Sequence, residues 1–196
     1  MLLLMIVFVW WHKATCQSNT GLEQYCFMDN KSITLSPKAW YQFNSGWYVE
    51  GRYNYDAAQT ASVYGGKTFE HEATFSYELT PLLGIIRGKL NGGAIGENAT
   101  VTYKKFMFSI QSQYMFSTQN TALNSMYSWS DLSYDFFKGL SAGVSMQRTN
   151  LYHTKGTSEK GIFLKAEFGK WEFPVYVFNP EGSERYVVMG LNYTHR

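Results

Sequence analysis

Apolar and polar residues alternate along short segments of this chain, from Trp47 to His195. In the first segment, Val49 falls on one side of the alternation, and Glu50 and Arg52 fall on the other. A period of two residues is typical of a β-strand whose two faces meet different surroundings. We therefore expect ten strands, at residues 47–56, 60–69, 73–87, 94–104, 106–117, 126–136, 140–153, 161–169, 171–179 and 185–194.

The polarity of the two faces indicates a membrane protein. The apolar faces carry almost no charge and tend to end in aromatic residues, while the polar faces are mostly Ser, Thr, Gly, Asn and Gln. A soluble lipocalin-like barrel would turn its apolar face inward, bind an apolar ligand there, and carry Lys and Glu outside. We expect an all-β fold, a closed antiparallel up-and-down transmembrane β-barrel of about ten strands within a range of about 8–12, and keep the soluble barrel as the alternative.

The connections alternate in length. Tight turns are expected at residues 104–105, 137–139 and 169–170, and longer loops at 89–93, 118–125, 153–160 and 179–184. Short turns on one rim and longer loops on the other are typical of an outer-membrane barrel with its short turns in the periplasm. Two features disturb the pattern: Pro81 and Pro174 lie inside expected strands, and Glu97 and Arg148 interrupt apolar faces.

The composition agrees with a membrane location. Charged residues make up 16% of the chain and aromatic residues 18%, whereas soluble domains have roughly 25% charged residues. The formal net charge of +2 is too small to indicate a nucleic-acid partner. No internal apolar run is long enough for a transmembrane helix, so any span must be made by a closed barrel.

The N-terminus has the features of a secretory signal peptide. Residues 2–11 form an apolar run, too short for a bilayer core that needs about 20 residues, and a small-residue stretch ends at Cys16. We expect cleavage of residues 1–16; lipidation of Cys16 is the alternative, although Lys13 occupies a position where a lipobox has an aliphatic residue. Cys26 would then be a lone, inert thiol. Residues 17–46 could be a tether, a plug or an extra strand, and residues 47–196 the barrel.

Five short motifs carry a family resemblance. They are GRYNY at 51–55, YSWSDL at 127–132, QRT at 147–149, YVFNP at 176–180 and YVV at 186–188. With them, the chain from about Trp40 onward resembles a group of uncharacterised bacterial outer-membrane β-barrel proteins. The resemblance implies a fold and a location in the bacterial outer membrane. It implies no activity and no catalytic residues.

The polar strand faces supply the residues expected to line the lumen, which are Glu50, Arg52, Asp56, Glu78, Gln111, Gln113, Asp131, Asp135, Gln147, Lys165, Glu167 and Glu172. These charges could form an ion-paired core, or their excess of carboxylates could line a narrow pathway that favours cations. About eight strands give a filled barrel and about sixteen an open channel. With four aromatic residues also facing inward, at Trp129, Phe163, Tyr176 and Phe178, we expect a nearly closed interior.

The apolar faces supply the residues expected to face lipid, which are Val49, Phe108, Ile110, Val144, Leu164, Val175 and Met189. Aromatic residues near the ends of these faces are expected at the bilayer interface. They are Trp47, Tyr55, Phe106, Phe116, Trp171 and Tyr193.

Catalysis is the least supported function. His153 lies at the loop rim without evident acid or base partners, which leaves a membrane-embedded hydrolase with a rim site as a remote alternative. No metal-ligand spacing, phosphate-binding loop or nucleophile elbow is present, so we expect no catalytic residue, no metal and no cofactor. We expect a narrow pore or a structural barrel whose partners are outer-membrane lipid and small cations or other small solutes. The oligomeric state cannot be predicted.

Overall fold

The structure, a computed structural model, describes residues 18–30, 32–152, 154–182 and 184–195. The expected signal peptide, Cys16 and His153 lie outside the described residues. The described residues form one short 3₁₀ turn (Thr121–Leu123) and thirteen strands, β1 (Asn19–Met28), β2 (Ile33–Gln42), β3 (Trp47–Tyr53), β4 (Thr60–Lys67), β5 (Phe69–His71), β6 (Phe75–Gly88), β7 (Gly92–Tyr103), β8 (Phe106–Ser117), β9 (Ser125–Phe137), β10 (Leu140–Leu151), β11 (Thr157–Phe168), β12 (Trp171–Phe178) and β13 (Tyr186–His195).

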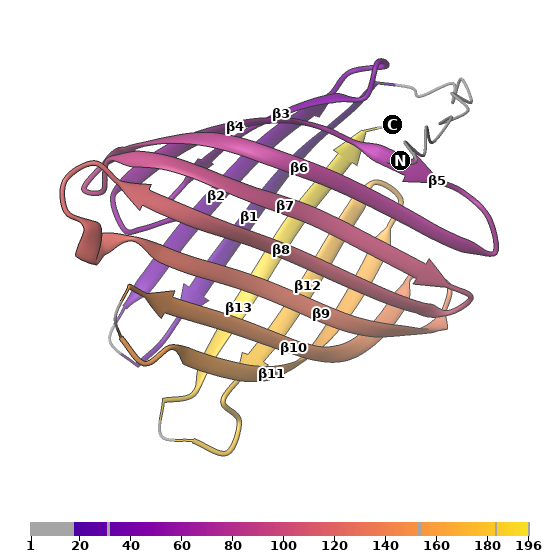
Figure 1. The fold of residues 1–196 in the computed structure, drawn as a ribbon. Helices are drawn as coiled ribbons and strands as arrows, with labels where there is room; N and C mark the ends of the chain where they lie inside the picture. Colours follow the sequence, from indigo (N-terminus) through magenta and orange to yellow (C-terminus); the bar gives the residue numbers. More distant parts are fainter. Residues whose placement is uncertain (1–17, 31, 153, 183, 196) are drawn as a thin grey trace, which may run out of the picture.

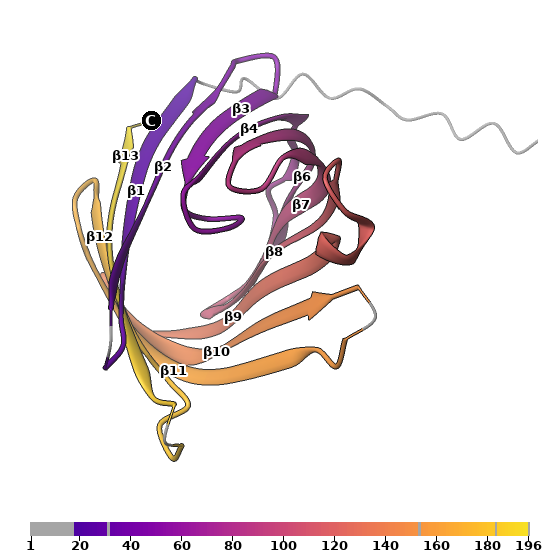
Figure 2. The ribbon, with the colours of Figure 1, turned by 90° about the vertical axis from the view of Figure 1, so that its left-hand side faces the viewer.

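The strands close into an antiparallel barrel (Figures 1 and 2). β1 pairs with both β2 and β13, and β4 pairs with both β3 and β6, so the sheet has no free edge at either junction. Closure pairs the backbone N–H and C=O groups, which an outer surface in lipid requires. The predicted class, a closed up-and-down β-barrel, is confirmed.

β4 and β5 act as one strand. Gly66 lies opposite Leu82 and Phe69 lies opposite Leu79, so both segments follow β6 in the same register. The break between them faces Pro81, which has no N–H to donate to the ladder. Counting β4 and β5 together, the described part of the chain forms a barrel of twelve strands.

The predicted number of ten strands is too low, because the barrel begins at Asn19 and not near residue 47. Residues 19–42, left open as a tether, a plug or an extra strand, form β1 and β2 and complete the wall. In β1 and β2 the alternation of apolar and polar residues is weak. Polar Gln24 lies on the outer face, opposite Pro37 on β2, while aromatic Tyr25 and Trp40 face the interior. The ten expected strands are all present, and the largest differences are that β3 ends at Tyr53 and not at residue 56, and that β11 begins at Thr157 and not at residue 161.

The two rims differ as the sequence predicts. Short turns after β7, β9 and β11 lie on the same rim as the start of β1 and the end of β13, where Thr20 pairs with His195. Lys104, Gly139 and Gly169 in these turns have positive φ values of 55°, 80° and 63°. The opposite rim carries the longer connections after β3, β8, β10 and β12 (Figure 1). The connection after β6, expected as a longer loop at residues 89–93, is a short turn between Gly88 and Gly92.

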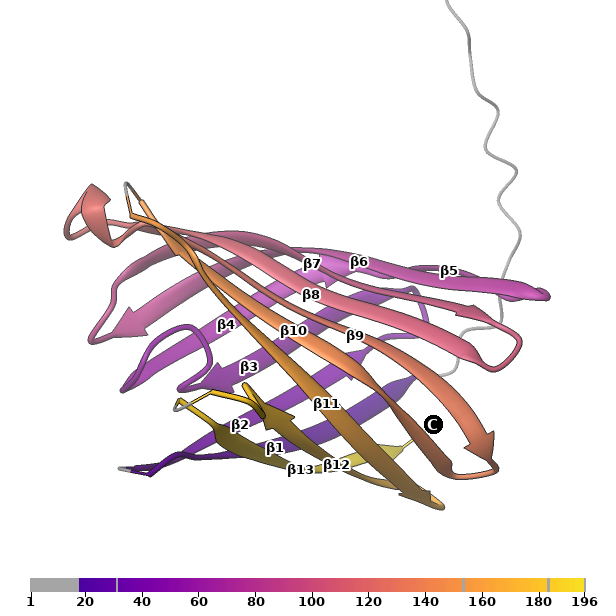
Figure 3. The ribbon, with the colours of Figure 1, turned by 90° about the horizontal axis from the view of Figure 1, so that it is seen from below.

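The distribution of polarity is the reverse of that in a soluble protein. Large apolar side chains are exposed on the outer wall, for example Val144 at 56% and Leu164 at 52%. Charged and polar side chains such as Glu50 and Arg52 are buried inside. Figure 3 shows β6 to β9 facing β1, β2 and β13 across this interior. A soluble barrel with an apolar interior is therefore contradicted, and the chain is an outer-membrane-type β-barrel.

Candidate functional site in the lumen

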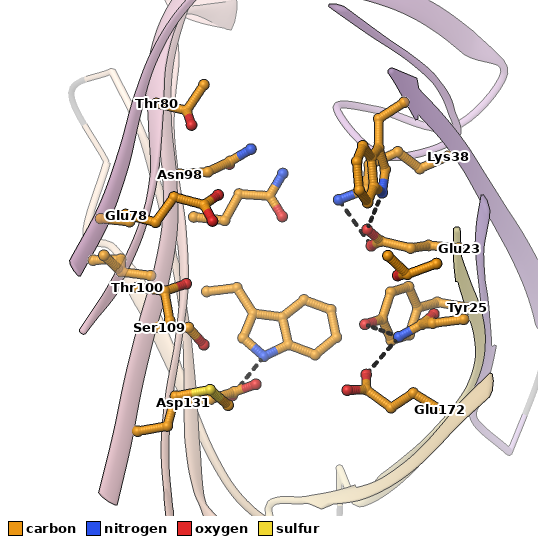
Figure 4. Close-up of a pocket in the computed structure, with 18 of the residues that line it drawn as sticks. Glu23, Tyr25, Lys38, Glu78, Thr80, Asn98, Thr100, Ser109, Asp131 and Glu172 are labelled. Atoms are coloured by element: carbon orange, nitrogen blue, oxygen red, sulfur yellow. Dashed lines mark hydrogen bonds and ion pairs between the residues drawn. The ribbon is translucent and has the colours of Figure 1, made fainter. Parts of the chain in front are cut away.

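A cavity of about 410 Å³, here called the vestibule, occupies the half of the lumen next to the short turns. Asn19, Gln42 and Thr194, at the strand ends of that rim, line it together with deeper residues such as Trp129. In Figure 4 one wall presents Glu78, Thr80, Asn98, Thr100, Ser109 and Asp131, and the facing wall presents Glu23, Tyr25, Lys38 and Glu172. The vestibule is thus a polar chamber that reaches one rim of the barrel.

Both lysines of the vestibule are held by carboxylates. Lys38 Nζ lies 2.8 Å from Glu23 Oε2, and Trp40 Nε1 donates to the other oxygen of Glu23 at 3.1 Å. Lys165 Nζ lies 3.1 Å from Glu172 Oε2 and 3.3 Å from Glu167 Oε1. Each cation is therefore neutralised by its own neighbour.

Asp131 is bound by neutral donors. Its Oδ1 accepts hydrogen bonds from Trp129 Nε1 at 3.0 Å and Ser145 Oγ at 2.6 Å, and its Oδ2 accepts one from Tyr176 OH at 3.0 Å. Asp131 forms no ion pair within the described ranges. Counting described residues only, four carboxylates and two ammonium groups line the vestibule, so its walls carry an excess of negative charge.

Arg52 crosses the centre of the lumen. Its Nε donates to Glu50 at 2.7 Å, and its Nη1 donates to Gln113 on β8 at 2.6 Å. The guanidinium also lies 4.3 Å from the centre of the Tyr64 ring. Interchanging the amide oxygen and nitrogen of Gln111 satisfies both atoms, and the oxygen then accepts from Nη1 and Nη2 at 3.0 and 2.7 Å. Since β3 and β8 are separated by β4, β6 and β7, this side chain narrows the passage.

The connection between β3 and β4 curls into the barrel and narrows it further (Figure 2). Asp56 accepts hydrogen bonds from Ser62, from Gln113 and, at 2.8 Å, from Tyr64 OH. Tyr55 lines the vestibule, with its ring 6.4 Å from that of Tyr25.

The expectation that Tyr55 lies at the bilayer interface is therefore wrong. The physical reason is local: Asn54 has a positive φ of 58°, which ends the alternation of β3 and turns the following residues inward. Asp56, expected inside, is inside, but as part of this connection and not of a strand.

Aromatic side chains fill the lumen beyond the vestibule. Five buried side chains form this cluster, here called the aromatic plug: Trp129, Phe163, Tyr176, Phe178 and the aliphatic Val188. Trp129, Phe163 and Tyr176 also form the inner end of the vestibule. The Trp129 ring lies 5.1 Å from Tyr176 and 6.0 Å from Phe178 in edge-to-face contacts. A second apolar cluster packs beside Arg52 and comprises Tyr64, Leu82, Ile86, Leu90, Ala94 and Met115. Together they separate the vestibule from a cavity of about 460 Å³ at the loop rim.

The remaining residues expected in the lumen lie at different depths. Gln147 is buried and lines the loop-rim cavity, whereas Glu78 lines the vestibule. Asp135 and Glu167 are exposed at the short-turn rim, away from the constriction. The vestibule brings together Glu78, Gln111, Asp131, Lys165 and Glu172 from the expected set.

Sequence reasoning missed the contribution of β1 and β2 to this site. Glu23, Tyr25, Lys38 and Trp40 all line the vestibule. The available signal was the alternation of residues 19–27, in which Glu23 and Tyr25 share a phase with Phe27. Asn192 on β13, also missed, donates to Glu172 at 2.9 Å and to Tyr25 OH at 3.2 Å.

The residues expected to face lipid lie on the outer wall. Val49, Phe108, Val175 and Met189 are exposed, and Ile110 is half-buried. Among the expected interfacial aromatics, the exposed side chains are Trp47, Phe106, Phe116 and Trp171. Tyr193 is half-buried, with its ring 4.8 Å from that of Trp171. Cys26, a free thiol, is half-buried on the same wall, where its ladder neighbours are Leu35 and Met189.

Two features are absent from the described residues. These residues contain no helix that is long and apolar enough to cross a membrane. They also contain no group of three or more His, Cys, Asp or Glu side chains arranged to hold a metal ion.

Solved structures match the whole barrel. The KdgM porin superimposes with a TM-score of 0.63 at 14% sequence identity, covering 90% of this chain and 99% of that chain. The KdgM porin in complex with disordered oligogalacturonate gives 0.64 at 14% identity with the same coverage. This chain has a porin fold. The NanC porin gives 0.56 at 9% identity, again covering 90% and 99% of the two chains.

The likeness to these porins concerns the fold alone. No protein-family model matches this porin-like chain, and no curated protein sequence matches it.

Proposed function

We propose that this protein is a narrow pore of the bacterial outer membrane that passes small solutes and prefers cations. The observation that carries the proposal is the polar vestibule on the barrel axis, about 410 Å³ in volume. A barrel with a purely structural role would gain by filling this space with packed side chains. A passive role in transport also agrees with the similar structures, which are porins.

The constriction supports a small conductance. Arg52, the β3–β4 connection and the aromatic plug occupy the section between the two cavities. A twelve-stranded barrel falls between the filled barrels of about eight strands and the open channels of about sixteen. Ions would have to pass between these side chains in single file.

The preference for cations follows from the charged groups of the vestibule. Lys38 and Lys165 are paired with carboxylates, while the donors to Asp131 among the described residues are all neutral. Rings of carboxylates favour cations in membrane pores. Glu159, which lines the loop-rim cavity, adds a carboxylate on the other side of the plug.

The outer wall supports the proposed location. Apolar side chains such as Val144 would contact lipid tails, and rim aromatics such as Trp47 and Trp171 would lie at the bilayer interface. The rim with short turns would face the periplasm, so the vestibule would open there. Export through a signal peptide cleaved near Cys16 belongs to the same proposal.

Single-channel recording in planar bilayers tests the pore and its constriction together. Trp129→Ala removes the ring that joins Tyr25, Tyr176 and Phe178, and it should give larger steps than the wild type. Trp171→Ala, at an exposed outer position, is the matched control and should leave the steps unchanged. Equal steps in all three proteins would show that the plug does not limit the current.

A structural barrel without conduction is the second candidate. The buried ion pair between Arg52 and Glu50, tied to Gln113, favours it because such a network can hold opposite walls together. This candidate predicts no steps from any variant, including Trp129→Ala.

A further inference from the structure

We propose that the vestibule is a binding site for an organic cation with a flat apolar body, such as an aryl-alkyl ammonium ion. This site would recognise the solute that the proposed pore passes, so its biological role rests on the proposed function. The ammonium group would lie beside Asp131 and the apolar body against the rings of Tyr25, Trp129 and Tyr176.

Asp131 has room for one more donor. A carboxylate offers about four lone-pair positions, and the described donors to Asp131 are Trp129, Ser145 and Tyr176. None of these donors carries a charge, so the negative charge of Asp131 is not neutralised by an ion pair. An ammonium ion supplies both the missing donor and the missing charge.

Two further acceptors in the vestibule have no donor among the described residues. Asn192 is only 8% exposed, and both hydrogen bonds described for it are donated by its Nδ2. Its Oδ1 has no partner in the described part of the chain, and neither does the Oδ1 of Asn98. Figure 4 shows the Asn98 side chain pointing into the cavity. Buried acceptors without donors are costly, so a ligand rich in donors would stabilise this arrangement.

The aromatic rings of the vestibule suit a cation. Trp129 lies 5.4 Å from Tyr25 and 5.1 Å from Tyr176, so the three rings form one continuous surface. The Trp129 indole donates to Asp131, which places the carboxylate at the edge of that surface. Ring faces attract cations when water is excluded, and a flat apolar body gains contact area on the same rings.

The charges of the vestibule disfavour an anion. A carboxylate ligand would have to compete with Glu23 for Lys38 and with Glu172 for Lys165. It would also approach Asp131 and the carboxylate of Glu78. The volume of about 410 Å³ lies within the usual range of small-molecule sites, roughly 300–1,000 Å³.

Isothermal titration calorimetry on the detergent-folded protein tests the site without any transport. The probes are phenethylamine as the cation, 3-phenylpropanoate as the anion, 2-phenylethanol as the neutral analogue, and maltose as an uncharged sugar. We expect phenethylamine to bind, and the other three to bind at least about tenfold more weakly, because none of them can donate a charge-assisted hydrogen bond from a cationic group to Asp131.

Asp131→Asn removes the charge at nearly constant shape and should weaken phenethylamine binding by about tenfold or more. Glu97→Gln is the matched control. It removes an equal charge from the outer wall, where Glu97 accepts a hydrogen bond from Ser112 at 3.2 Å, and it should leave binding unchanged. If Asp131→Asn does not fold, Glu172→Gln is measured instead. It removes one carboxylate that neutralises Lys165, so the vestibule becomes less negative and phenethylamine binding should weaken.

Three results would overturn the site. These are equal binding of phenethylamine and 2-phenylethanol, binding of maltose in preference to phenethylamine, and no binding by a protein whose gel mobility shows a folded barrel. A protein that conducts but binds none of the probes refutes the site alone. A protein that binds phenethylamine but never conducts refutes the pore alone.

Discussion

The ion pair between Arg52 and Glu50 offers the sharpest test of how dry the centre of the barrel is. Arg52→Leu removes the guanidinium and leaves Glu50, which is 1% exposed, without its counter-ion. Removal of one partner of a buried ion pair costs about 3–5 kcal/mol, because the remaining charge stays desolvated. Tyr48 OH still donates to Glu50 at 2.8 Å, so we expect a cost near the lower value, about 3 kcal/mol.

Urea unfolding in lipid vesicles or detergent, followed by the heat-modifiable gel shift, measures this cost. With a slope of about 2 kcal/mol per molar urea, Arg52→Leu should lower the midpoint by about 1.5 M. Replacing both partners, as Glu50→Leu with Arg52→Leu, should recover much of the loss, because no buried charge is then left without a partner.

Lys38→Leu is the matched comparison. It breaks a pair whose carboxylate, Glu23, lies in the open vestibule at 20% exposure and keeps its hydrogen bond from Trp40. We expect it to cost about 1 kcal/mol or less, as for ion pairs that water can reach. Equal losses of unfolding free energy for Arg52→Leu and Lys38→Leu would contradict a dry centre, since they would mean that water solvates the centre as well as the vestibule.

Two further predictions concern the inner and outer faces of the wall. A Cβ at Gly190 would lie 2.5 Å from Pro174 Cγ and 2.8 Å from Tyr25 Cε1, so Gly190→Ala should lower the free energy of unfolding by about 1–3 kcal/mol. Gly93→Ala is the control in the same urea titration. Its added Cβ would lie 3.5 Å from the nearest atom, the backbone oxygen of Gly84, so the free energy of unfolding should change little. On the outer wall, Val144→Arg should disfavour assembly in lipid vesicles by about 2–4 kcal/mol, while Val144→Leu should assemble normally. Normal assembly of Val144→Arg would contradict contact of this face with lipid.

The fold could be predicted from the sequence wherever the two faces of a strand meet different media. From β6 onward, the outer residues are mostly apolar and the inner ones mostly small or polar, apart from the buried aromatic and aliphatic side chains of the plug and of the second apolar cluster, so period and face agree. In β1, Tyr25 and Phe27 face the interior and pack against the aromatic plug, while polar Gln24 lies on the outer wall. The contrast between the faces is therefore weak there, and two strands could not be recognised.

The part of the constriction formed by Arg52 and the β3–β4 connection could not be predicted, because its contacts join residues far apart in the chain. Arg52 and Gln113 are 61 positions apart, and they meet only because the barrel closes. The inward turn of Tyr55 depends on the positive φ of Asn54, which alternation does not reveal. By contrast, Trp129 and Tyr176 could be placed inside from strand phase alone, since each lies well within a regular strand.

The most direct test of the proposed function is the current through the folded wild-type protein in a planar bilayer, recorded in a gradient of potassium chloride. We predict small, stable steps and a reversal potential whose sign shows that the pore prefers potassium over chloride. Protein that shows the heat-modifiable shift of a folded barrel yet gives no steps would contradict the pore. Large steps, or a reversal potential that indicates anions, would contradict the constriction and the carboxylate-rich vestibule.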